Sequence, residues 1–257
     1  MPRGTAGGRT PSASVEPVPA TDHTPRSVLV TGAGRGIGRA IAERFVAAGD
    51  RVATFHRSGD LPAGVLGVVA DVRDTAAVDA GFEQVEAAHG PVEVLVANAG
   101  ITRDQLVLRM TDEEFEEVLD VNLVGAFRVV RRASKGMIRA RWGRIVLISS
   151  VVGLYGSPGQ VNYAASKSAL VGMARSLTRE LGGRGITANV VAPGFVDTDM
   201  TRALPDERRT AYLDAIPAGR FAEPDEVAAV VEFLASPAAA YISGAVVPVD
   251  GGLGMGH

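Results

Sequence analysis

The fold is decided by the stretch LVTGAGRGIGRAIA, residues 29–42. A short apolar run ends at Thr31, glycines follow at every second position from 32 to 38, and a helical pattern continues beyond them. Glycine permits a tight turn and a close approach of the backbone, and the start of the helix favours a phosphate. This order predicts a dinucleotide-binding site. We expect the dinucleotide to contact Gly32, Gly34, Arg35, Gly36, Ile37 and Gly38.

Beyond this turn, short apolar segments alternate with longer amphipathic ones. Strands are expected at 27–33, 51–56, 67–72, 92–100, 144–150, 186–194 and 245–252, and helices at 36–49, 75–90, 112–141, 162–183 and 224–236. Most of the strand segments are apolar throughout, as in strands that are covered on both faces. The pattern predicts an α/β fold, a single-domain Rossmann-type doubly wound parallel seven-stranded sheet with helices on both faces.

Local signals set the expected ends of these helices. Thr111 and Glu114 have the spacing of a capping box that opens the long central helix. Gly49, Gly90 and Gly182 follow helical segments, as C-terminal caps do. Residues 197–224 are expected to form the main irregular insertion, at a strand end where α/β proteins place ligands.

Composition narrows the class of protein. Residues 1–25 are rich in Gly, Pro, Ser and Thr and are expected to form a disordered tail, and residues 26–257 a single domain. A net charge of −3 gives no reason to expect nucleic acid, and without cysteine a disulfide or thiolate metal site is excluded. The four scattered histidines form no metal-ligand pattern, so no metal is expected. The glycine turn lacks the Gly-Lys-Ser/Thr of a P-loop NTPase.

The chain also lacks the marks of membrane insertion and export. No apolar run is long enough to cross a membrane, and the N-terminal segment has no signal-peptide core. We therefore expect a cytoplasmic protein with no membrane partner.

The ends of the next strands suggest how the adenosine half of the cofactor is held. An acidic residue at the end of the second strand would suit NAD, but His56 and Arg57 stand there. Arg57 and Arg35 converging on a 2′-phosphate would favour NADPH over a reading in which both are merely solvated. Asp71 is expected to meet the adenine amino group with Val72 beside the ring. The segment Asn98 to Gly100 lets the cofactor approach the end of the fourth strand.

The chain has two lysines, Lys135 and Lys167, and Lys167 stands four residues after Tyr163. Residues i and i+4 of a helix lie on the same face, so these two side chains can meet. An ammonium favours the ionised form of a nearby phenol and would lower its pKa, making Tyr163 a usable acid or base. The alternative is a solvated surface lysine.

Together these motifs resemble the short-chain dehydrogenase/reductase family. The resemblance covers residues 26–252 and is carried by Thr31 to Gly38, Asn98 to Gly100, Ser150, Tyr163, Lys167 and Pro193-Gly194, with Ser150 thirteen positions before Tyr163 as in that family. The segments WGRIVLISSVVGLYGSPGQVNYAASK and YISGAVVPVDGGLGMGH are similar to 3-oxoacyl-[acyl-carrier-protein] reductases, above all to those of the actinobacterial type II fatty acid and mycolic acid pathway.

The resemblance implies roles for the site residues. Tyr163 would donate a proton to a ketone, Lys167 would lower the pKa of the phenol and bind the nicotinamide ribose, and Ser150 would hold the carbonyl. Ser149 would face the other way, because neighbours on a strand alternate. Asn122 would hold a water of the proton relay, which is compatible with an amide that caps or bends a helix. The backbone of Val196 and the hydroxyl of Thr198 would meet the nicotinamide carboxamide, and Pro193 and Gly194 would also contact the cofactor.

The insertion 197–224 would then form a lid over the substrate. An acidic acyl carrier protein needs a basic dock near the mouth of the site, and Arg141 and Arg184 match docking positions of the family, although a generic solvated surface explains them equally. Tyr155 would touch the acyl chain or simply pack. The family is usually homotetrameric.

The expected activity is NADPH-dependent reduction of 3-oxoacyl-acyl-carrier-protein to the 3-hydroxyacyl form in fatty acid elongation. Two alternatives stand beside it. One is another NADP(H)-dependent ketone or alcohol oxidoreductase that acts on acetoacetyl-CoA, a steroid or a sugar. The other is a non-catalytic NADP(H)-sensing protein, against which the intact set of site residues argues.

Overall fold

The structure is a computed structural model and describes residues 24–57, 60–202 and 205–255. The predicted tail, residues 1–25, therefore lies outside the described residues except for Thr24 and Pro25, and its disorder stays a prediction. Among the described helices, none combines the length and the hydropathy needed to cross a membrane.

A single parallel sheet of seven strands forms the centre of the structure. Its order is β3-β2-β1-β4-β5-β6-β7. The strands are β1 (Ser27–Thr31), β2 (Arg51–His56), β3 (Val65–Val69), β4 (Val94–Ala97), β5 (Gly143–Ile148), β6 (Ile186–Pro193) and β7 (Val246–Val249). All of the pairings between neighbouring strands are parallel, so the predicted fold class is confirmed.

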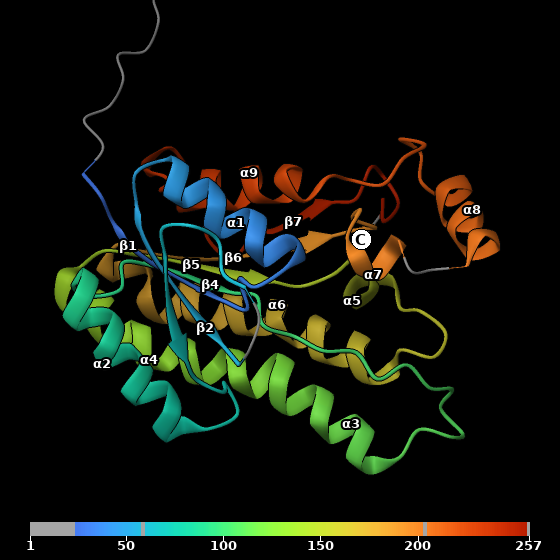
Figure 1. The fold of residues 1–257 in the computed structure, drawn as a ribbon, viewed down its shortest axis with the longest axis horizontal. Helices are drawn as coiled ribbons and strands as arrows, with labels where there is room; N and C mark the ends of the chain where they lie inside the picture. Colours follow the sequence, from blue (N-terminus) through green and yellow to red (C-terminus); the bar gives the residue numbers. More distant parts are fainter. Residues whose placement is uncertain (1–23, 58–59, 203–204, 256–257) are drawn as a thin grey trace, which may run out of the picture.

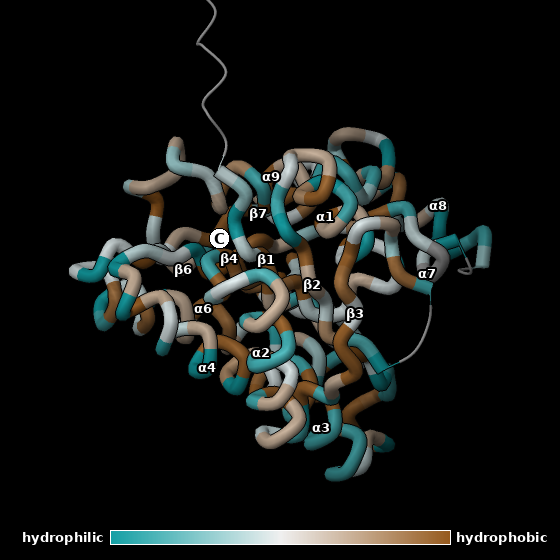
Figure 2. The backbone as a smooth tube through the Cα atoms, turned by 60° about the vertical axis from the view of Figure 1, so that its left-hand side comes forward, coloured by the Kyte–Doolittle hydropathy of each residue, from teal (hydrophilic) through white to brown (hydrophobic). Residues whose placement is uncertain are grey.

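Helices cover the two faces of the sheet in separate layers (Figure 1). One face carries α1 (Gly36–Ala47) and α9 (Pro224–Ala235), and the other carries α2 (Thr75–His89), α4 (Gly125–Ala140) and α6 (Val161–Leu181). Each layer has its own apolar cluster, and the strands alternate their side chains between the two. The hydropathy of the chain follows this arrangement, with the apolar strands enclosed between helices of mixed character (Figure 2).

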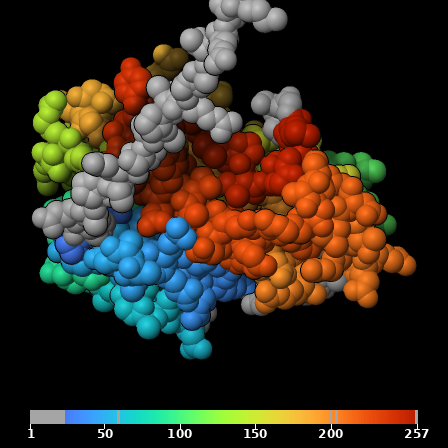
Figure 3. All heavy atoms as spheres, turned by 90° about the horizontal axis from the view of Figure 1, so that it is seen from above, coloured from blue at the N-terminus to red at the C-terminus, as the bar shows by residue number. Residues whose placement is uncertain are grey.

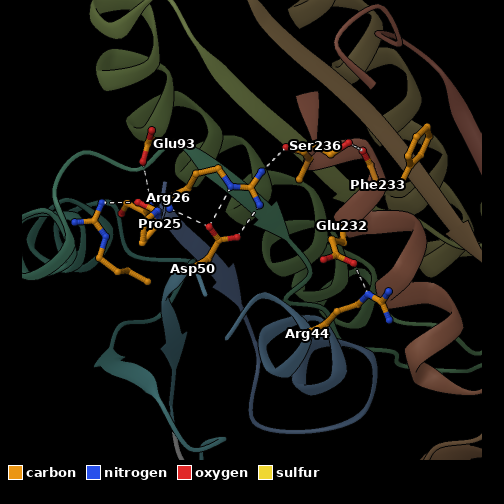
Figure 4. Close-up of polar contacts among 11 residues, drawn as sticks. Pro25, Arg26, Arg44, Asp50, Glu93, Glu232, Phe233 and Ser236 are labelled. Atoms are coloured by element: carbon orange, nitrogen blue, oxygen red, sulfur yellow. Dashed lines mark hydrogen bonds and ion pairs between the residues drawn. The ribbon is translucent and has the colours of Figure 1, made fainter. Parts of the chain in front are cut away.

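A buried ion pair joins the layer of α1 and α9 to the start of the sheet. Arg26 directs its backbone N and two guanidinium nitrogens at the Asp50 carboxylate, and its Nη1 donates to the Ala235 carbonyl at 2.7 Å (Figure 4). The Asp50 side chain is fully buried. Nearby, Arg44 of α1 pairs with Glu232 of α9 at 2.5 Å. The two helices consequently lie side by side across one face (Figure 3).

The helices and strands lie where they were predicted, but several of their ends differ, since β1, β4 and β7 are shorter than the predicted 27–33, 92–100 and 245–252. Strand β3 begins at Val65, two residues before the expected 67, and ends at Val69 because Asp71 starts a turn. The capping box at Thr111 opens α3 (Asp112–Leu119) as expected. Gly182 follows α6 as its C-cap, as predicted, but its φ of −56° is right-handed, and a short 3₁₀ turn continues to Gly185, whose φ is +73°.

Two further differences lie close to the carboxyl ends of the strands. The long central helix is interrupted by a π-helical turn, η1 (Asp120–Val124), between α3 and α4. The insertion 197–224 is not irregular, since it contains the short α7 (Asp199–Arg202) and α8 (Asp206–Ala215). Another short helix, α5 (Val152–Tyr155), follows β5.

Candidate active site

The glycine-rich turn between β1 and α1 has the shape that a dinucleotide requires. Gly32 and Gly36 have positive φ, at +75° and +53°, which side chains rarely adopt. A Cβ on Gly38 would lie 2.3 Å from the Gly32 carbonyl oxygen, so only glycine fits there. The N-cap residue Arg35 makes no side-chain hydrogen bond to the start of α1, so the first amide groups of this helix suit phosphate oxygens. These residues fit the predicted cofactor.

Asn98 fixes this turn from the neighbouring strand β4. Its Nδ2 donates to the carbonyl oxygens of Thr31 and Gly32, at 2.9 and 3.2 Å, and its backbone N donates to the Thr31 hydroxyl. The order of the sheet reverses between β1 and β4, and open α/β sheets bind ligands at such a switch point. The predicted site residue Asn98 thus holds the turn itself.

The adenosine end of the site is strongly basic. Arg35 and Arg57 are both exposed, after β1 and β2, and neither forms an ion pair with the described residues. Asp71 is occupied: Arg73 donates to both of its carboxylate oxygens, at 2.6 to 3.1 Å. Arg73 holds the pKa of Asp71 below its usual range, with a smaller contribution from Arg57. Adenine would share Asp71 with Arg73, which sequence reasoning had not singled out although it follows two positions later.

Tyr163 and Lys167 lie on one face of α6, as predicted; Lys167 is buried and Tyr163 is partly buried. The Lys167 Nζ lies 5.7 Å from the centre of the Tyr163 ring and donates to the Ile148 carbonyl at 2.8 Å. The residue is only 4% exposed, so the alternative of a solvated surface lysine is wrong. A Cβ on Gly100 would come within 3.3 Å of that nitrogen, which places the Asn98–Gly100 segment against the same cluster.

The two neighbouring serines after β5 take different directions. Ser149 is buried, and its hydroxyl donates to the Lys167 carbonyl at 2.8 Å, which fixes α6 to the sheet. Ser150 is partly exposed, its hydroxyl accepts from Val152 N, and it lies close enough to the Tyr163 phenol to lower the pKa of that group. The thirteen-residue spacing therefore selects the serine that meets the phenol.

Burial governs the titration of the pair, and here one expectation is wrong. Desolvation raises the pKa of Tyr163 to about 12, against the lowering effect of its hydrogen bond with Ser150. Desolvation also lowers the pKa of Lys167 to about 8. The expected depression of the phenol pKa by Lys167 is not found, because desolvation of the phenolate is the largest influence on this group and raises its pKa. Tyr163 is fully protonated at neutral pH, as a proton donor must be.

Asn122 stands in the π-helical turn η1 and is buried. Its Oδ1 accepts from Ile101 N at 2.8 Å, and its Nδ2 donates to the Ile101 carbonyl and to the Ser166 hydroxyl, both at 3.0 Å. The amide is thus committed to joining the segment after β4 to α6. Single π-helical turns within α-helices are frequent at functional sites. The expected reading as an amide that shapes the helix agrees with this geometry.

The predicted carboxamide segment follows β6 and closes the other side of the site. Pro193 and Val196 are buried, and a Cβ on Gly194 would lie 2.8 Å from the Cα of Asp250. The Thr198 side chain reaches the glycine turn, 3.4 Å from the position of a Cβ on Gly36. Ile37 lies partly buried in the first turn of α1. The segment therefore faces the phosphate end of the turn.

Sequence reasoning missed the residue that holds this segment. The Thr201 hydroxyl donates to the Val196 and Thr198 carbonyl oxygens, at 2.6 and 3.0 Å, and accepts from Thr198 N at 2.9 Å. A threonine three residues after another is the only signal, and it is a common one.

Helix α8, which belongs to the segment predicted to form a lid, is docked through aromatic side chains. Tyr212 stacks on Phe195 with ring centres 4.0 Å apart, and Phe195 in turn meets Phe221 at 5.8 Å. Tyr155 is half exposed, and burial together with Tyr212 and Asp250 raises its pKa. Tyr155 consequently faces the lid and the C-terminal turn, at the rim of the site.

The two arginines expected to dock a carrier protein lie together, but not at the mouth of this site. Arg141 donates to the Gly183 carbonyl at 3.4 Å, beside Arg184. Both precede strands β5 and β6, whereas Ser150 and Gly194 follow those strands. Tyr163 and Leu181 are separated along α6 by roughly 27 Å at 1.5 Å per residue. The expectation of a dock near the mouth is therefore wrong within one chain, because the strands run between the two places.

Comparison with known proteins shows which family has a sequence similar to this chain. A family described as Enoyl-(Acyl carrier protein) reductase matches residues 32–254. The chain is 57% identical over 232 residues to the 3-oxoacyl-[acyl-carrier-protein] reductase MabA of Mycobacterium tuberculosis, covering 90% of this chain and 94% of that protein. It is 48% identical over 235 residues to the 3-oxoacyl-[acyl-carrier-protein] reductase FabG of Escherichia coli, covering 88% and 96%.

The chain belongs to the short-chain dehydrogenase/reductase family. This confirms the resemblance drawn from the glycine turn and the Ser150, Tyr163 and Lys167 spacing, and with it the prediction of an oxidoreductase. The family and its fold imply a nicotinamide cofactor, and the glycine turn fits one.

Proposed function

We propose that this chain reduces 3-oxoacyl groups carried on acyl carrier protein to 3-hydroxyacyl groups with NADPH, in fatty acid elongation. The names of the relatives that it matches over nine-tenths of its length support this reaction. The observation that carries the proposal is the clustering of Tyr163, Ser150 and the buried Lys167, whose Nζ lies 5.7 Å from the centre of the Tyr163 ring, beside the Asn98–Gly100 segment.

The chain supplies the acid and the hydrogen bonds of such a reduction. Hydride would reach the carbonyl carbon from the bound dihydronicotinamide. The Ser150 hydroxyl and the Tyr163 phenol would both bind the ketone oxygen, where negative charge develops, and Tyr163 would give it a proton. Lys167, protonated below its pKa of about 8, would stabilise the phenolate that remains.

Replacement of the acid tests this proposal. Tyr163→Phe should lower kcat at least about a hundredfold with acetoacetyl-CoA and NADPH, because general acids contribute this much or more. Tyr241→Phe is the matched control, since Tyr241 is fully exposed and should leave kcat unchanged. Undiminished turnover by Tyr163→Phe would refute the assignment. NADPH binding without turnover by the unmodified protein would favour the sensing protein instead.

Substrate choice separates the remaining alternatives. The proposal expects 3-oxoacyl-acyl-carrier-protein to be reduced with a higher kcat/KM than an enoyl thioester, a steroid ketone or a sugar. A preference for the enoyl thioester would instead agree with the printed description of the matching family.

The preference for NADPH is proposed from the basic adenosine end of the site. Arg35 and Arg57 would pair with the 2′-phosphate, and no carboxylate stands directly at the end of β2. Arg57→Ala should raise KM for NADPH about tenfold or more and leave KM for NADH nearly unchanged. Arg51→Ala, at the opposite end of the same strand, is the control. Equal losses for both cofactors would refute the role of Arg57.

The partners are likewise part of the proposal. Arg141 and Arg184 lie where strands β5 and β6 begin, at the end of the sheet away from Tyr163. A carrier protein docked there would therefore serve the site of a neighbouring subunit in a homotetramer. Arg184→Glu should raise KM for the carrier-protein substrate and leave KM for acetoacetyl-CoA unchanged, because an acidic partner would be repelled. A monomer in light scattering would refute this arrangement. The cytoplasmic location stays a prediction.

A further inference from the structure

Arg144, at the start of β5, is a buried cation for which the described residues supply no counter-charge. Its exposed fraction is 3%, it forms no ion pair with the described residues, and its Nε has no hydrogen-bond partner among them. Burial lowers the pKa of its guanidinium, and the charge of Arg26 adds to this effect. A buried charge of this kind lowers stability, and an apolar side chain would avoid that cost. Its presence therefore points to a role other than stability.

The guanidinium of Arg144 joins the turn before β5 to the turn before β6. Its Nη1 donates to the Gly143 carbonyl at 2.9 Å and to the Gly185 carbonyl at 3.2 Å, and its central carbon lies 4.6 Å from the centre of the Trp142 ring. A guanidinium suits this combination, because it is planar, offers several donors in one fork and packs on aromatic faces. A lysine ammonium could keep the charge but not this geometry.

The turn before β6 carries Arg184, whose two neighbours in the chain are both held from the other turn. Arg141 Nη2 donates to the Gly183 carbonyl at 3.4 Å, and Arg144 holds the Gly185 carbonyl. The two backbones approach closely, since a Cβ on Gly185 would lie 2.6 Å from the Arg141 carbonyl oxygen. The positions of Arg141 and Arg184 relative to each other are therefore fixed.

Arg141 also has a backbone conformation that suits glycine better. It follows α4 as the C-cap residue with φ 53° and ψ 35°, and among the described residues it is the one non-glycine residue with a positive φ. Glycine is the usual residue at such a helix end, because the left-handed region is strained for residues that carry a side chain. Backbone strain of this kind is often found at functional sites. The conformation thus indicates that the Arg141 side chain has a use on the surface.

We propose that Arg144 is a positioning residue of the basic dock formed by Arg141 and Arg184, which it sets in one arrangement for an acidic acyl carrier protein. The inference rests on the proposed function, which supplies the carrier protein as the partner. Arg144 is buried and would not touch that partner, whereas Arg141 and Arg184 are both exposed. Groups that are held in place before binding lose less freedom when a partner binds. Loosening them should weaken docking and leave the chemistry at Tyr163 unchanged, because the strands separate the two places.

Arg144→Lys tests this role, because it keeps the charge and loses the fork and the plane of the guanidinium. KM for 3-oxoacyl-acyl-carrier-protein should rise about threefold, as when well-placed ion pairs are lost, while KM for acetoacetyl-CoA and kcat with both substrates stay the same. Arg51→Lys is the matched control, since Arg51 is exposed at the start of β2, at the same end of the sheet. If Arg144→Lys does not fold, Gly185→Ala replaces it, because its Cβ would displace the Arg141 carbonyl from an exposed turn.

A double-mutant cycle separates positioning from a general loss of structure. The dock is absent in Arg141→Ala/Arg184→Ala, so adding Arg144→Lys to this variant should raise KM for the carrier-protein substrate no further. A further threefold rise in this background would overturn the inference. An unchanged KM in Arg144→Lys alone, or an equal rise in KM for acetoacetyl-CoA, would overturn it as well.

Failure of the proposed function would give a different result. Arg141→Ala/Arg184→Ala would then keep the KM of the unmodified protein for the carrier-protein substrate, and both the dock and the role of Arg144 would be refuted. Failure of the inference alone would leave that variant impaired and Arg144→Lys unimpaired.

Discussion

Replacement of the buried Lys167 by methionine tests the electrostatics of the site without any ligand. Desolvation lowers the pKa of Lys167 from 10.5 to about 8 in the folded protein. The folded state therefore disfavours the ammonium, and each pKa unit corresponds to about 1.4 kcal/mol. Lys167→Met removes this penalty and keeps a flexible side chain of similar length.

The sign of the effect follows from proton binding. Between about pH 8 and pH 10.5 the unfolded chain holds the lysine proton and the folded chain does not, so the free energy of unfolding rises with pH. Below about pH 8 both states hold the proton and the penalty is fully present. From about pH 7 to about pH 10, the Lys167 contribution should raise the free energy of unfolding by about 2.5 kcal/mol.

Urea unfolding at both pH values, at one protein concentration because oligomers unfold in a concentration-dependent way, measures the effect. The unmodified protein should gain about 2.5 kcal/mol more than Lys167→Met between the two conditions. Lys135→Met is the matched control, because Lys135 is the other lysine and is exposed. Equal pH dependence in Lys167→Met and the unmodified protein would refute the claim that burial sets the titration of this amine.

Three more substitutions test other parts of the structure. Gly38→Ala should abolish dinucleotide binding in a fluorescence titration, because the added Cβ would overlap the Gly32 backbone. The control Gly172→Ala, on an open helical surface, should bind the dinucleotide normally and gain up to about 1 kcal/mol in stability. Normal binding by Gly38→Ala would contradict the turn geometry. Asn122→Ala should lower the free energy of unfolding by roughly 2 to 4 kcal/mol, since it leaves buried groups unpaired, and a change below about 0.5 kcal/mol would contradict this. Arg26→Ala should lower it by roughly 3 kcal/mol because the buried Asp50 carboxylate loses the Arg26 guanidinium, and thermal unfolding of Asp50→Asn should show a smaller loss.

The sheet could be predicted from the sequence because its strands are buried on both faces. Segments such as β6, in which every residue is buried, admit few other structures once glycine and proline bound them. The helices with a buried stripe were likewise found. Helix α8 was missed because none of its residues is buried, so it has no apolar period to detect. Gly182 was predicted correctly as the residue that follows α6, but the short 3₁₀ turn up to Gly185 was not, because the sequence does not show which of these glycines adopts a positive φ.

The same contrast between predicted and missed features holds for the candidate site. Tyr163, Lys167, Ser150 and Asn98 were found because they stand at strand ends or at helical spacing. Titration was predicted with the wrong sign for the phenol, since burial is a property of the packed fold and not of a four-residue interval. Ion pairs such as Arg73 with Asp71 could not be predicted, because they depend on side-chain rotamers that the neighbouring residues in the sequence do not reveal.

The π-helical turn at Asn122 has a consequence for any attempt to make the chain more regular. One extra residue in that turn rotates α3 by about 100° relative to a continuous helix with α4. Deleting a residue there would restore uniform backbone bonding, yet it would swing either the amide or the face that α3 presents to α6 out of place. Attempts to raise the thermal stability of the protein by shortening loops should therefore leave this turn intact, because its irregular geometry sets the alignment of two separate segments.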